Sequence, residues 1–197
     1  NLYMLKTFAT ICIIGMFTSS CTSKKASRTE GSHEAEQDLT MIVGTYTSGD
    51  SKGLYSFRFN EENGTATALS EAEVENPSYL VPSADGKFIY AVSEFSNEQA
   101  AANAFAFNKE EGTFRLLNTQ KTGGEDPCYI ITNGSNVVTA NYSGGSISVF
   151  PIDKDGSLLP ASEVVKFKGS GADKERQEKP HLHCVRITPD GKYLFAD

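Results

Sequence analysis

The stretch NPSYLVPSADGKFIYAVSE, residues 76–94, decides the fold, because its pattern returns twice further along the chain. Residues 126–141 read DPCYIITNGSNVVTAN, and residues 179–197 read KPHLHCVRITPDGKYLFAD. The prolines near the start of these three stretches are 50 and 53 residues apart. Self-similarity at this period indicates repeated supersecondary units that stack on one another.

Each unit predicts four short strands. In residues 76–94, SYLVPS and KFIYAVS flank the dipeptide Asp85-Gly86, which is typical of the turn of a β-hairpin. The stretch NAFAFNKEEGTFRLLNT, residues 103–119, continues with alternating strand residues on both sides of a Glu-Gly break. Four strands in about fifty residues are typical of a β-propeller blade. A β-sandwich of irregular meanders is the alternative, but it would not require the proline period.

The two ends of the repeat region hold incomplete units. Residues 41–75 read as the last three strands of an earlier blade, and residues 179–197 supply the first two strands of a later one. We therefore expect an all-β chain with about three blades of an incomplete ring of four-stranded blades. Ring closure removes exposed sheet edges, so residues 39–197 are expected to be the N-terminal portion of a longer propeller. Alone, this portion should aggregate or form a molten state.

The composition excludes one class of partner. The chain of 197 residues is 39% hydrophobic and 22% charged, as in globular proteins. Its formal net charge is -7, and no sustained basic run occurs. Because nucleic acids are bound through clustered Lys and Arg, we expect no nucleic-acid partner. Nothing in the composition indicates an oligomeric state.

The N-terminal segment predicts export from the cytoplasm. Residues 1–20 carry one positive charge, then an apolar run and small residues; the run is too short to span a bilayer and is typical of an export signal. Cys21 directly after small residues resembles the lipidated cysteine of bacterial lipoproteins, although Thr18 stands where that pattern usually has Leu. An ordinary cleaved signal is the alternative. Residues 21–38 are polar and predict a tether, so we expect a lipid-anchored envelope protein that contacts the membrane through this lipid alone.

Two histidines follow the third proline. His181 and His183 lie one and three residues after Pro180, and alternate residues of a strand project to the same side. The corresponding positions after the earlier prolines hold small or apolar residues, so the repeat itself does not require histidine. These residues are Ser78, Leu80, Cys128 and Ile130. The first strand of a propeller blade lies beside the central channel, so both imidazoles are expected to share one channel face, where one can accept a proton while the other donates.

Two other readings of the histidines remain open. They could be a partly buried pair bonded to backbone, or zinc ligands, since His-x-His on a strand is a common ligand pair. No third nitrogen or sulfur ligand is apparent nearby, and the cysteines form no CxxC pair. We therefore expect no metal and no cofactor. Cys128 and Cys184 lie in strand-like segments and are expected to be buried free thiols rather than a disulfide.

Three polar residues are candidates for substrate binding at the ends of second strands. Glu94, Asn141 and Asp197 lie 17, 14 and 17 residues after their prolines. If these positions are equivalent, they ring one end of the propeller and could bind substrate hydroxyls or orient the histidines. Each could equally bond a loop of a neighbouring blade, and for Asn141 that structural role is as well supported as binding.

A basic spot precedes the histidines on this acidic chain. Arg176 and Gln177 lie in a loop with Lys174 and Lys179. The planar donor fork of arginine suits a carboxylate or a phosphate on a ligand. A solvated loop charge is the alternative for Arg176.

Several of these motifs together resemble one family. VGTYT (43–47), ADGKFIYAVSE (84–94), NYSGGSISVF (141–150) and above all ERQEKPHLHCVRITPDGKYLFAD (175–197) are similar to the seven-bladed propeller lactonases. That family includes bacterial 6-phosphogluconolactonases and fungal carboxymuconate-cyclizing enzymes. The resemblance covers residues 41–197.

The resemblance implies hydrolysis of a sugar lactone without a cofactor. His181, His183 and Arg176 would be catalytic, and Gln177 would join the three strand-end residues in binding substrate. A 6-phosphogluconolactonase of central metabolism belongs in the cytoplasm, whereas the N-terminus predicts export, so the substrate could be an unphosphorylated lactone. The alternatives are a non-catalytic envelope propeller that binds a glycan or a protein partner, and a lactonizing enzyme of the muconate-cyclase type.

Overall fold

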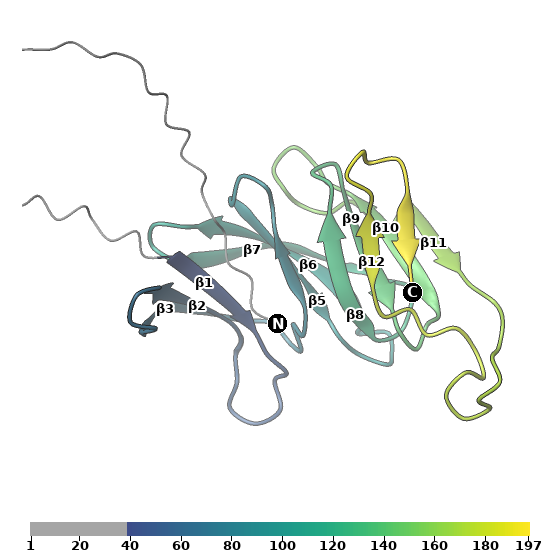
Figure 1. Cartoon of the computed structure of the whole chain (residues 1–197). Helices are drawn as coiled ribbons and strands as arrows, with labels where there is room; N and C mark the ends of the chain where they lie inside the picture. The colour runs from purple at the N-terminus through teal and green to yellow at the C-terminus, as the bar shows by residue number, and fades with distance from the viewer. Residues whose placement is uncertain (1–38) are drawn as a thin grey trace, which may run out of the picture.

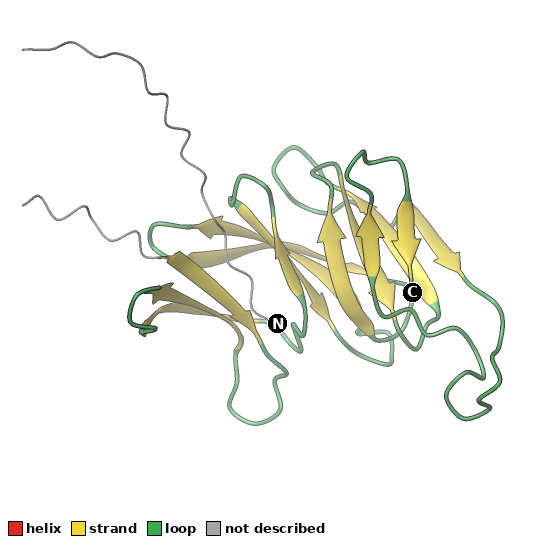
Figure 2. Ribbon diagram, in the orientation of Figure 1, coloured by secondary structure: helices red, strands yellow, loops and turns green. Residues whose placement is uncertain are grey.

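The computed structural model describes residues 39–197, which form strands joined by loops and turns (Figure 2). The predicted export signal, the polar tether and the lipidation of Cys21 lie outside the described residues. Within the described part of the chain, no helix is long and apolar enough to cross a membrane.

The strands form antiparallel sheets that follow one another along the chain (Figure 1). Blade 1 contains β1 (Leu39–Gly44), β2 (Gly53–Phe59) and β3 (Ala66–Glu73). Blade 2 contains β4 (Leu80–Pro82), β5 (Phe88–Ser93), β6 (Ala101–Asn108) and β7 (Thr113–Lys121). Blade 3 contains β8 (Pro127–Thr132), β9 (Asn136–Asn141), β10 (Ser146–Pro151) and β11 (Glu163–Lys166). Unit 4 contains β12 (Val185–Ile187) and β13 (Leu194–Ala196). The prediction of two whole blades flanked by two incomplete ones is confirmed.

Neighbouring blades bury their faces against each other. The second strands of blades 2 and 3, β5 and β9, are buried along almost their whole length, because both faces of each strand are covered. One apolar cluster joins blades 1 and 2 through Leu54, Ile89 and Phe105. A larger cluster joins blades 2 and 3 to unit 4. Each large apolar side chain that is fully buried stabilises the fold by about 1.5–3 kcal/mol.

The hairpin of unit 4 fixes which residues correspond between blades. Leu80 pairs with Ala91 in blade 2, and Val185 pairs with Ala196 in unit 4. The turns that join these strands have the same length, and a backbone hydrogen bond closes each of them. These bonds join the amide of Ser83 to the carbonyl of Phe88 (2.8 Å) and the amide of Thr188 to the carbonyl of Tyr193 (2.9 Å). Val185 therefore corresponds to Leu80.

This correspondence corrects the alignment of the repeat by its prolines. Counting back from Val185 puts Leu182, rather than Pro180, at the place that Pro77 holds in blade 2. Leu182 is buried, as Pro77 is. The proline alignment is wrong in unit 4 because Pro180 lies five residues before Val185, whereas Pro77 lies three residues before Leu80.

Candidate active site

A cavity of about 710 Å³ lies where the inner strands of the blades begin. Ser78, Cys128 and His183 hold corresponding places in three successive units and all line it. Blade 1 contributes Tyr46 to the same cavity. The cavity is therefore built from one level of the inner strands, which in a propeller border the central channel.

A bulge at the start of β12 aims the side chains of unit 4. The backbone amides of His183 and Cys184 both donate to the carbonyl of Asp197, at 2.6 and 3.3 Å. Two residues facing one is the geometry of a β-bulge, and bulges re-aim side chains next to sites. In a regular strand, residues three apart point to opposite faces. Here His183 and Arg186 both line the cavity.

Arg186 is a site residue that the sequence analysis missed. The guanidinium carbon lies 5.7 Å from the centre of the Tyr129 ring, and Tyr129 stacks on Tyr79 with ring centres 4.2 Å apart. The places that correspond to Arg186 hold aliphatic residues, Val81 and Ile131. Aligning the hairpin turns of the repeat instead of its prolines would have revealed this exchange.

Glu94, one of the residues singled out for substrate binding, lines the cavity. Ser78 Oγ donates a short hydrogen bond to the Glu94 carboxylate. Partial burial raises the pKa of the nearby Tyr46 hydroxyl above its ordinary value, and its hydrogen bond to Glu94 and the charge of Glu94 raise it further. The carboxylate is thus held by a neighbouring hydroxyl within the cavity wall, where it can accept hydrogen bonds from a polyhydroxylated ligand.

Cys128 and Cys184 are free thiols in the cavity wall. Cys128 Sγ lies 3.6 Å from the carbonyl oxygen of His183 and 3.7 Å from that of Leu182. Burial raises the pKa of Cys128 to about 12, and the charge of Glu94 adds to this effect. Cys128 is therefore protonated at neutral pH and is poorly suited to act as a nucleophile.

The two histidines contact one tyrosine but line different cavities. The ring of Tyr142 lies 4.7 Å from that of His181 and 6.0 Å from that of His183, measured between centres. His181 borders a second cavity, of about 370 Å³, beside the loop before β12. The structure therefore does not show the predicted shared channel face: both histidines lie before β12, and the bulge at His183 breaks the alternation of a regular strand.

His181 is held by a carboxylate of its own loop. Its Nε2 lies 3.0 Å from Glu178 Oε1. Its Nδ1 is buried and has no hydrogen-bond partner among residues 39–197. The hydrogen bond from the backbone amide of Glu178 lowers the pKa of the Glu178 carboxyl, and His181 lowers it further.

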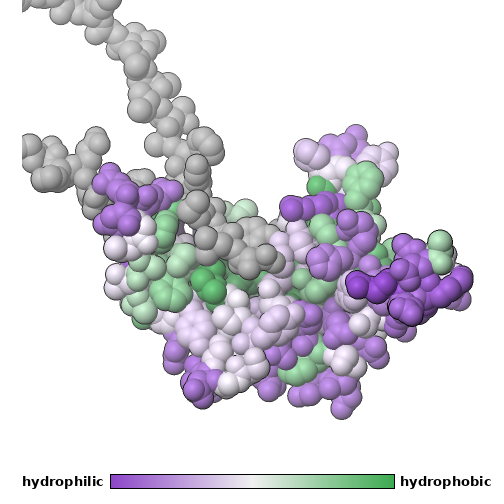
Figure 3. All heavy atoms as spheres, turned by 60° about the horizontal axis from the view of Figure 1, so that its bottom comes forward, coloured by the Kyte–Doolittle hydropathy of each residue, from purple (hydrophilic) through white to green (hydrophobic). Residues whose placement is uncertain are grey.

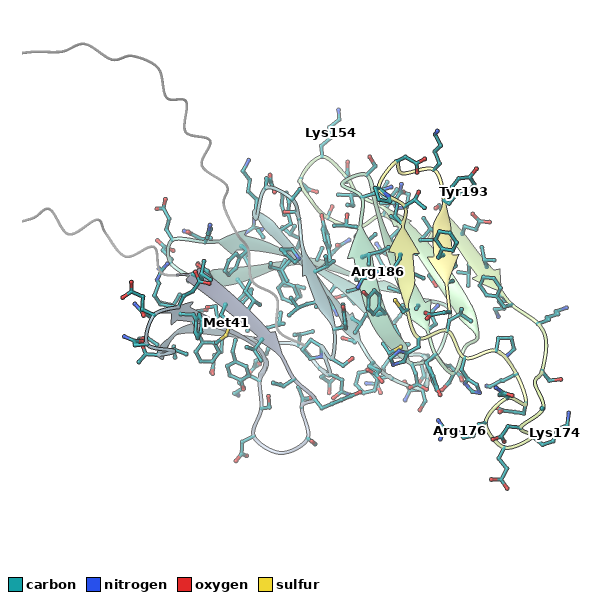
Figure 4. The ribbon with its side chains drawn as sticks, viewed as in Figure 1. Met41, Lys154, Lys174, Arg176, Arg186 and Tyr193 are labelled. Atoms are coloured by element: carbon teal, nitrogen blue, oxygen red, sulfur yellow. The ribbon has the colours of Figure 1, made fainter. Side chains whose placement is uncertain are left out.

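Arg176 and Gln177 border this second cavity and not the one that holds His183. They lie on the long loop after β11, which forms a strongly hydrophilic projection (Figure 3). Figure 4 shows Arg176 on that projection with Lys174, whereas Arg186 lies among the inner strands. Gln177 Oε1 accepts the backbone amide of Asp173 at 3.2 Å. The structure thus separates the predicted catalytic arginine from His183.

Asn141 is enclosed within blade 3. It is fully buried, and its amide nitrogen donates to the hydroxyls of Ser146 (3.0 Å) and Ser148 (2.8 Å). Its carbonyl oxygen accepts from Thr139 at 3.0 Å. These bonds within the blade give Asn141 a structural role, and it is not brought to the cavity.

The prediction that Glu94, Asn141 and Asp197 hold equivalent places at the ends of second strands is wrong. The amides of Glu94 and Tyr142 make the same backbone hydrogen bond, to Asn76 (3.1 Å) and Asp126 (2.8 Å). Tyr142, and not Asn141, therefore corresponds to Glu94.

Asp197 does not correspond to Glu94 either. Its amide bonds to the carbonyl of Cys184 (3.1 Å), as that of Val92 bonds to the carbonyl of Tyr79 (3.0 Å). Asp197 therefore corresponds to Val92, because the offset of two residues in unit 4 carries through the hairpin.

A metal centre finds no support in this geometry. Among residues 39–197, no group of three or more His, Cys, Asp and Glu side chains could hold a metal ion. His181 and His183, the pair considered for zinc, border separate cavities.

Comparisons with known proteins agree with this architecture. Residues 40–197 match the family model described as "Lactonase, 7-bladed beta-propeller". A 6-phosphogluconolactonase of Bacillus subtilis is 38% identical over 160 residues, which are 78% of this chain and 44% of the relative. The chain thus spans about half the length of the curated relatives it matches.

Two solved structures superpose well on the chain. A Bacteroides fragilis protein provisionally named a 6-phosphogluconolactonase is 71% identical, with a TM-score of 0.81 over 85% of this chain and 47% of that one. The periplasmic gluconolactonase PpgL of Pseudomonas aeruginosa is 32% identical, with a TM-score of 0.73 over 80% of this chain and 46% of that one. The blades, their order and the family match lead to one conclusion: the chain belongs to the lactonase family of seven-bladed β-propellers.

Proposed function

We propose that the full-length protein hydrolyses a sugar lactone, with His183 as general base. The reaction would take place in the cavity of about 710 Å³ that His183 lines, called the channel cavity from here on. The observation that carries the proposal is the position of His183: it lines the cavity at a place where the neighbouring blades have Ser78 and Cys128. The named activities of the relatives support the same reaction class. Because the fold does not need histidine there, a chemical role explains its presence.

The reaction needs one proton acceptor and one water molecule. His183 takes a proton from water as the water oxygen bonds to the lactone carbonyl carbon. The bond between that carbon and the ring oxygen then breaks, and the ring oxygen receives the proton, which gives the open hydroxy acid. A positioned base typically contributes about 10²–10⁴ in rate. Glu94 and Tyr46, which border the same cavity, are placed to bind hydroxyls of the sugar.

The proposal gives the other predicted site residues no direct role in the channel cavity. His181, Arg176 and Gln177 border the second cavity, from which they could act on the reaction only through Tyr142 or a ligand that reaches both cavities. Substrate binding by Asn141 and Asp197 remains a prediction, and no contact with the channel cavity supports it.

We also propose that the protein works in the cell envelope. The support is the N-terminal sequence, with an export signal over residues 1–20 and a lipidated Cys21, followed by a polar tether to residue 38. The relative PpgL is named a periplasmic gluconolactonase. Radiolabelled palmitate incorporation that is lost in Cys21→Ala would support the lipid anchor; equal labelling of both proteins would contradict it.

The activity test uses the full-length protein from Cys21 onward. Acid release is followed from glucono-δ-lactone and from its 6-phosphate, against buffer alone. We expect His183→Ala to lose about 10²–10⁴ in kcat and His181→Ala to lose much less, with circular dichroism confirming that both variants fold. If the wild type does not exceed buffer on either lactone, the lactonase proposal fails and the cavity becomes a candidate binding site for a glycan or a protein.

A further inference from the structure

We propose that Arg186 is the residue that selects for a negatively charged group on the substrate. This inference rests on the proposed function, because it takes the channel cavity as the site of the lactone. Sequence reasoning had given this role to Arg176, which borders a different cavity on an exposed loop.

The first support is the exchange of residue type between blades. The inner strands of blades 2 and 3 carry Val81 and Ile131 where β12 carries Arg186. Both aliphatic side chains pack against the core between the blades. An arginine is therefore not required by the architecture, and it replaces apolar packing with a permanent positive charge beside the cavity.

The second support is how the guanidinium group is held. It lies over the Tyr129 ring, and Tyr129 is itself buried and stacked on Tyr79. Contact between a guanidinium group and an aromatic face is attractive. The charge is thus fixed against a rigid wall of the cavity, so little side-chain freedom is lost when a ligand binds.

The third support is the charge of the cavity lining. Glu94 is the acidic side chain of this lining, and its carboxylate already accepts the Ser78 hydroxyl. A carboxylate repels an anion, so an anionic group is expected on the Arg186 side of the cavity. Planar bidentate donation by arginine matches the oxygens of a phosphate or a carboxylate.

The fourth support is the distance from the proposed base. His183 and Arg186 are three positions apart in the chain, so their Cα atoms lie at most about 11 Å apart. A lactone whose carbonyl lies at His183 can therefore place a substituent from the far side of its ring at Arg186. One residue would act on the reacting carbonyl and the other on the distal group.

The test compares Arg186→Val with Arg186→Lys in the full-length protein. Valine is the residue that blade 2 has at this place, so the variant is expected to fold. Arg115→Val, on the exposed outer strand β7, is the matched control. Arg176→Gln measures the contribution of the loop.

Two readouts are taken. The first is kcat and KM for glucono-δ-lactone and for its 6-phosphate. The second is binding of glucose 6-phosphate, glucuronate and glucose by calorimetry, which does not depend on turnover and separates a phosphate from a carboxylate as the recognised group.

We expect Arg186→Val to raise KM for the phosphorylated lactone about 10- to 100-fold, at least ten times more than for the unphosphorylated one. Binding of glucose 6-phosphate or of glucuronate should weaken in parallel, and Arg186→Lys should lie between the two proteins. Equal losses on both lactones through kcat, no change in either readout, or a larger loss of anion binding in Arg176→Gln would each overturn the inference. If the wild type shows no turnover but binds the anionic sugars through Arg186, the lactonase proposal fails, and only the role of Arg186 in binding an anionic group in the cavity stands.

Discussion

Gly156 in blade 3 packs directly against Phe88 in blade 2. A Cβ atom added to Gly156 would lie 2.1 Å from Cε1 of the Phe88 ring. The carbonyl oxygen of Gly156 also accepts the hydroxyl of the buried Tyr90 at 3.2 Å. This contact joins two blades through a turn that has no room for a side chain.

The contact gives a matched pair of glycine variants. Gly156 and Gly134 have the same φ of +87°, but a Cβ at Gly134 would meet no atom within 4 Å. Both alanine variants carry the strain of a positive φ, and only Gly156→Ala also clashes. We expect Gly156→Ala to lower the free energy of unfolding by about 1–3 kcal/mol more than Gly134→Ala does. Urea denaturation of the full-length protein measures this difference, and equal losses would contradict the packing described.

The buried amide of Asn141 predicts a stability effect. Asn141→Ala removes both donors and the acceptor of its network and leaves buried hydroxyls without a partner. We expect a loss of about 1–3 kcal/mol in the free energy of unfolding. Asn63→Ala, in an exposed turn where water can replace the lost bonds, should cost clearly less. A higher KM for the lactone at unchanged stability would instead support the predicted role of Asn141 in substrate binding.

The raised pKa of Cys128 predicts low reactivity. With a pKa of about 12, the thiolate fraction at pH 8 is on the order of 10⁻⁴, against about a quarter for an ordinary cysteine. Iodoacetamide should therefore alkylate Cys128 about 10³-fold more slowly in the folded protein than in the same protein unfolded in urea. Peptide mapping by mass spectrometry measures both rates. Rapid labelling in the folded protein would show that the thiol is not buried as described.

Three turn carboxylates predict how stability depends on pH. Hydrogen bonds from neighbouring hydroxyls lower the pKa values of Asp85, Asp155 and Asp190 below their ordinary range. The donors are Ser83, Ser157 and Thr188. A lowered pKa in the folded state stabilises the protein above the ordinary pKa of about 3.9, and this stabilisation is lost as the pH falls through the folded values.

The measurement for these carboxylates compares the wild type with the triple variant in which all three are Asn. The wild type should be more stable at pH 6, and the gap should close as the pH falls below about 4. Urea midpoints taken at several pH values follow the gap. A gap that does not change with pH would mean that the carboxylate charges do not matter.

The sequence predicted the fold well because the hairpins carry local signals. The Asp85-Gly86 turn and the alternation around it define blade 2 without knowledge of distant contacts. The same features recur in unit 4, and the strands there form as predicted. A repeated unit is predictable in this way because each copy carries the same turn residues and the same alternation of strand residues.

The site was predicted less well, because its geometry depends on register. His183 and Glu94 were singled out by their residue types and their spacing from the prolines, and both line the cavity. Arg186 was missed, and the predicted shared face of His181 and His183 is not shown, since a bulge and a longer loop shift the phase of alternation before β12. In this bulge two backbone amides donate to the same carbonyl, and no residue type in the sequence predicts that arrangement.

The longer loop before β12 shows that the blades can change their chemistry one at a time. Residues 167–184 join β11 to β12, whereas the shorter segment 74–79 joins β3 to β4, and the hairpin of unit 4 still keeps the pairing found in blade 2. New functional groups can therefore be introduced, by evolution or by protein engineering, at the start of the inner strand of one blade without repacking the neighbouring blades. Histidine introduced at the places of Ser78 or Cys128, with matching loop insertions, would extend the catalytic repertoire of the same scaffold around its axis.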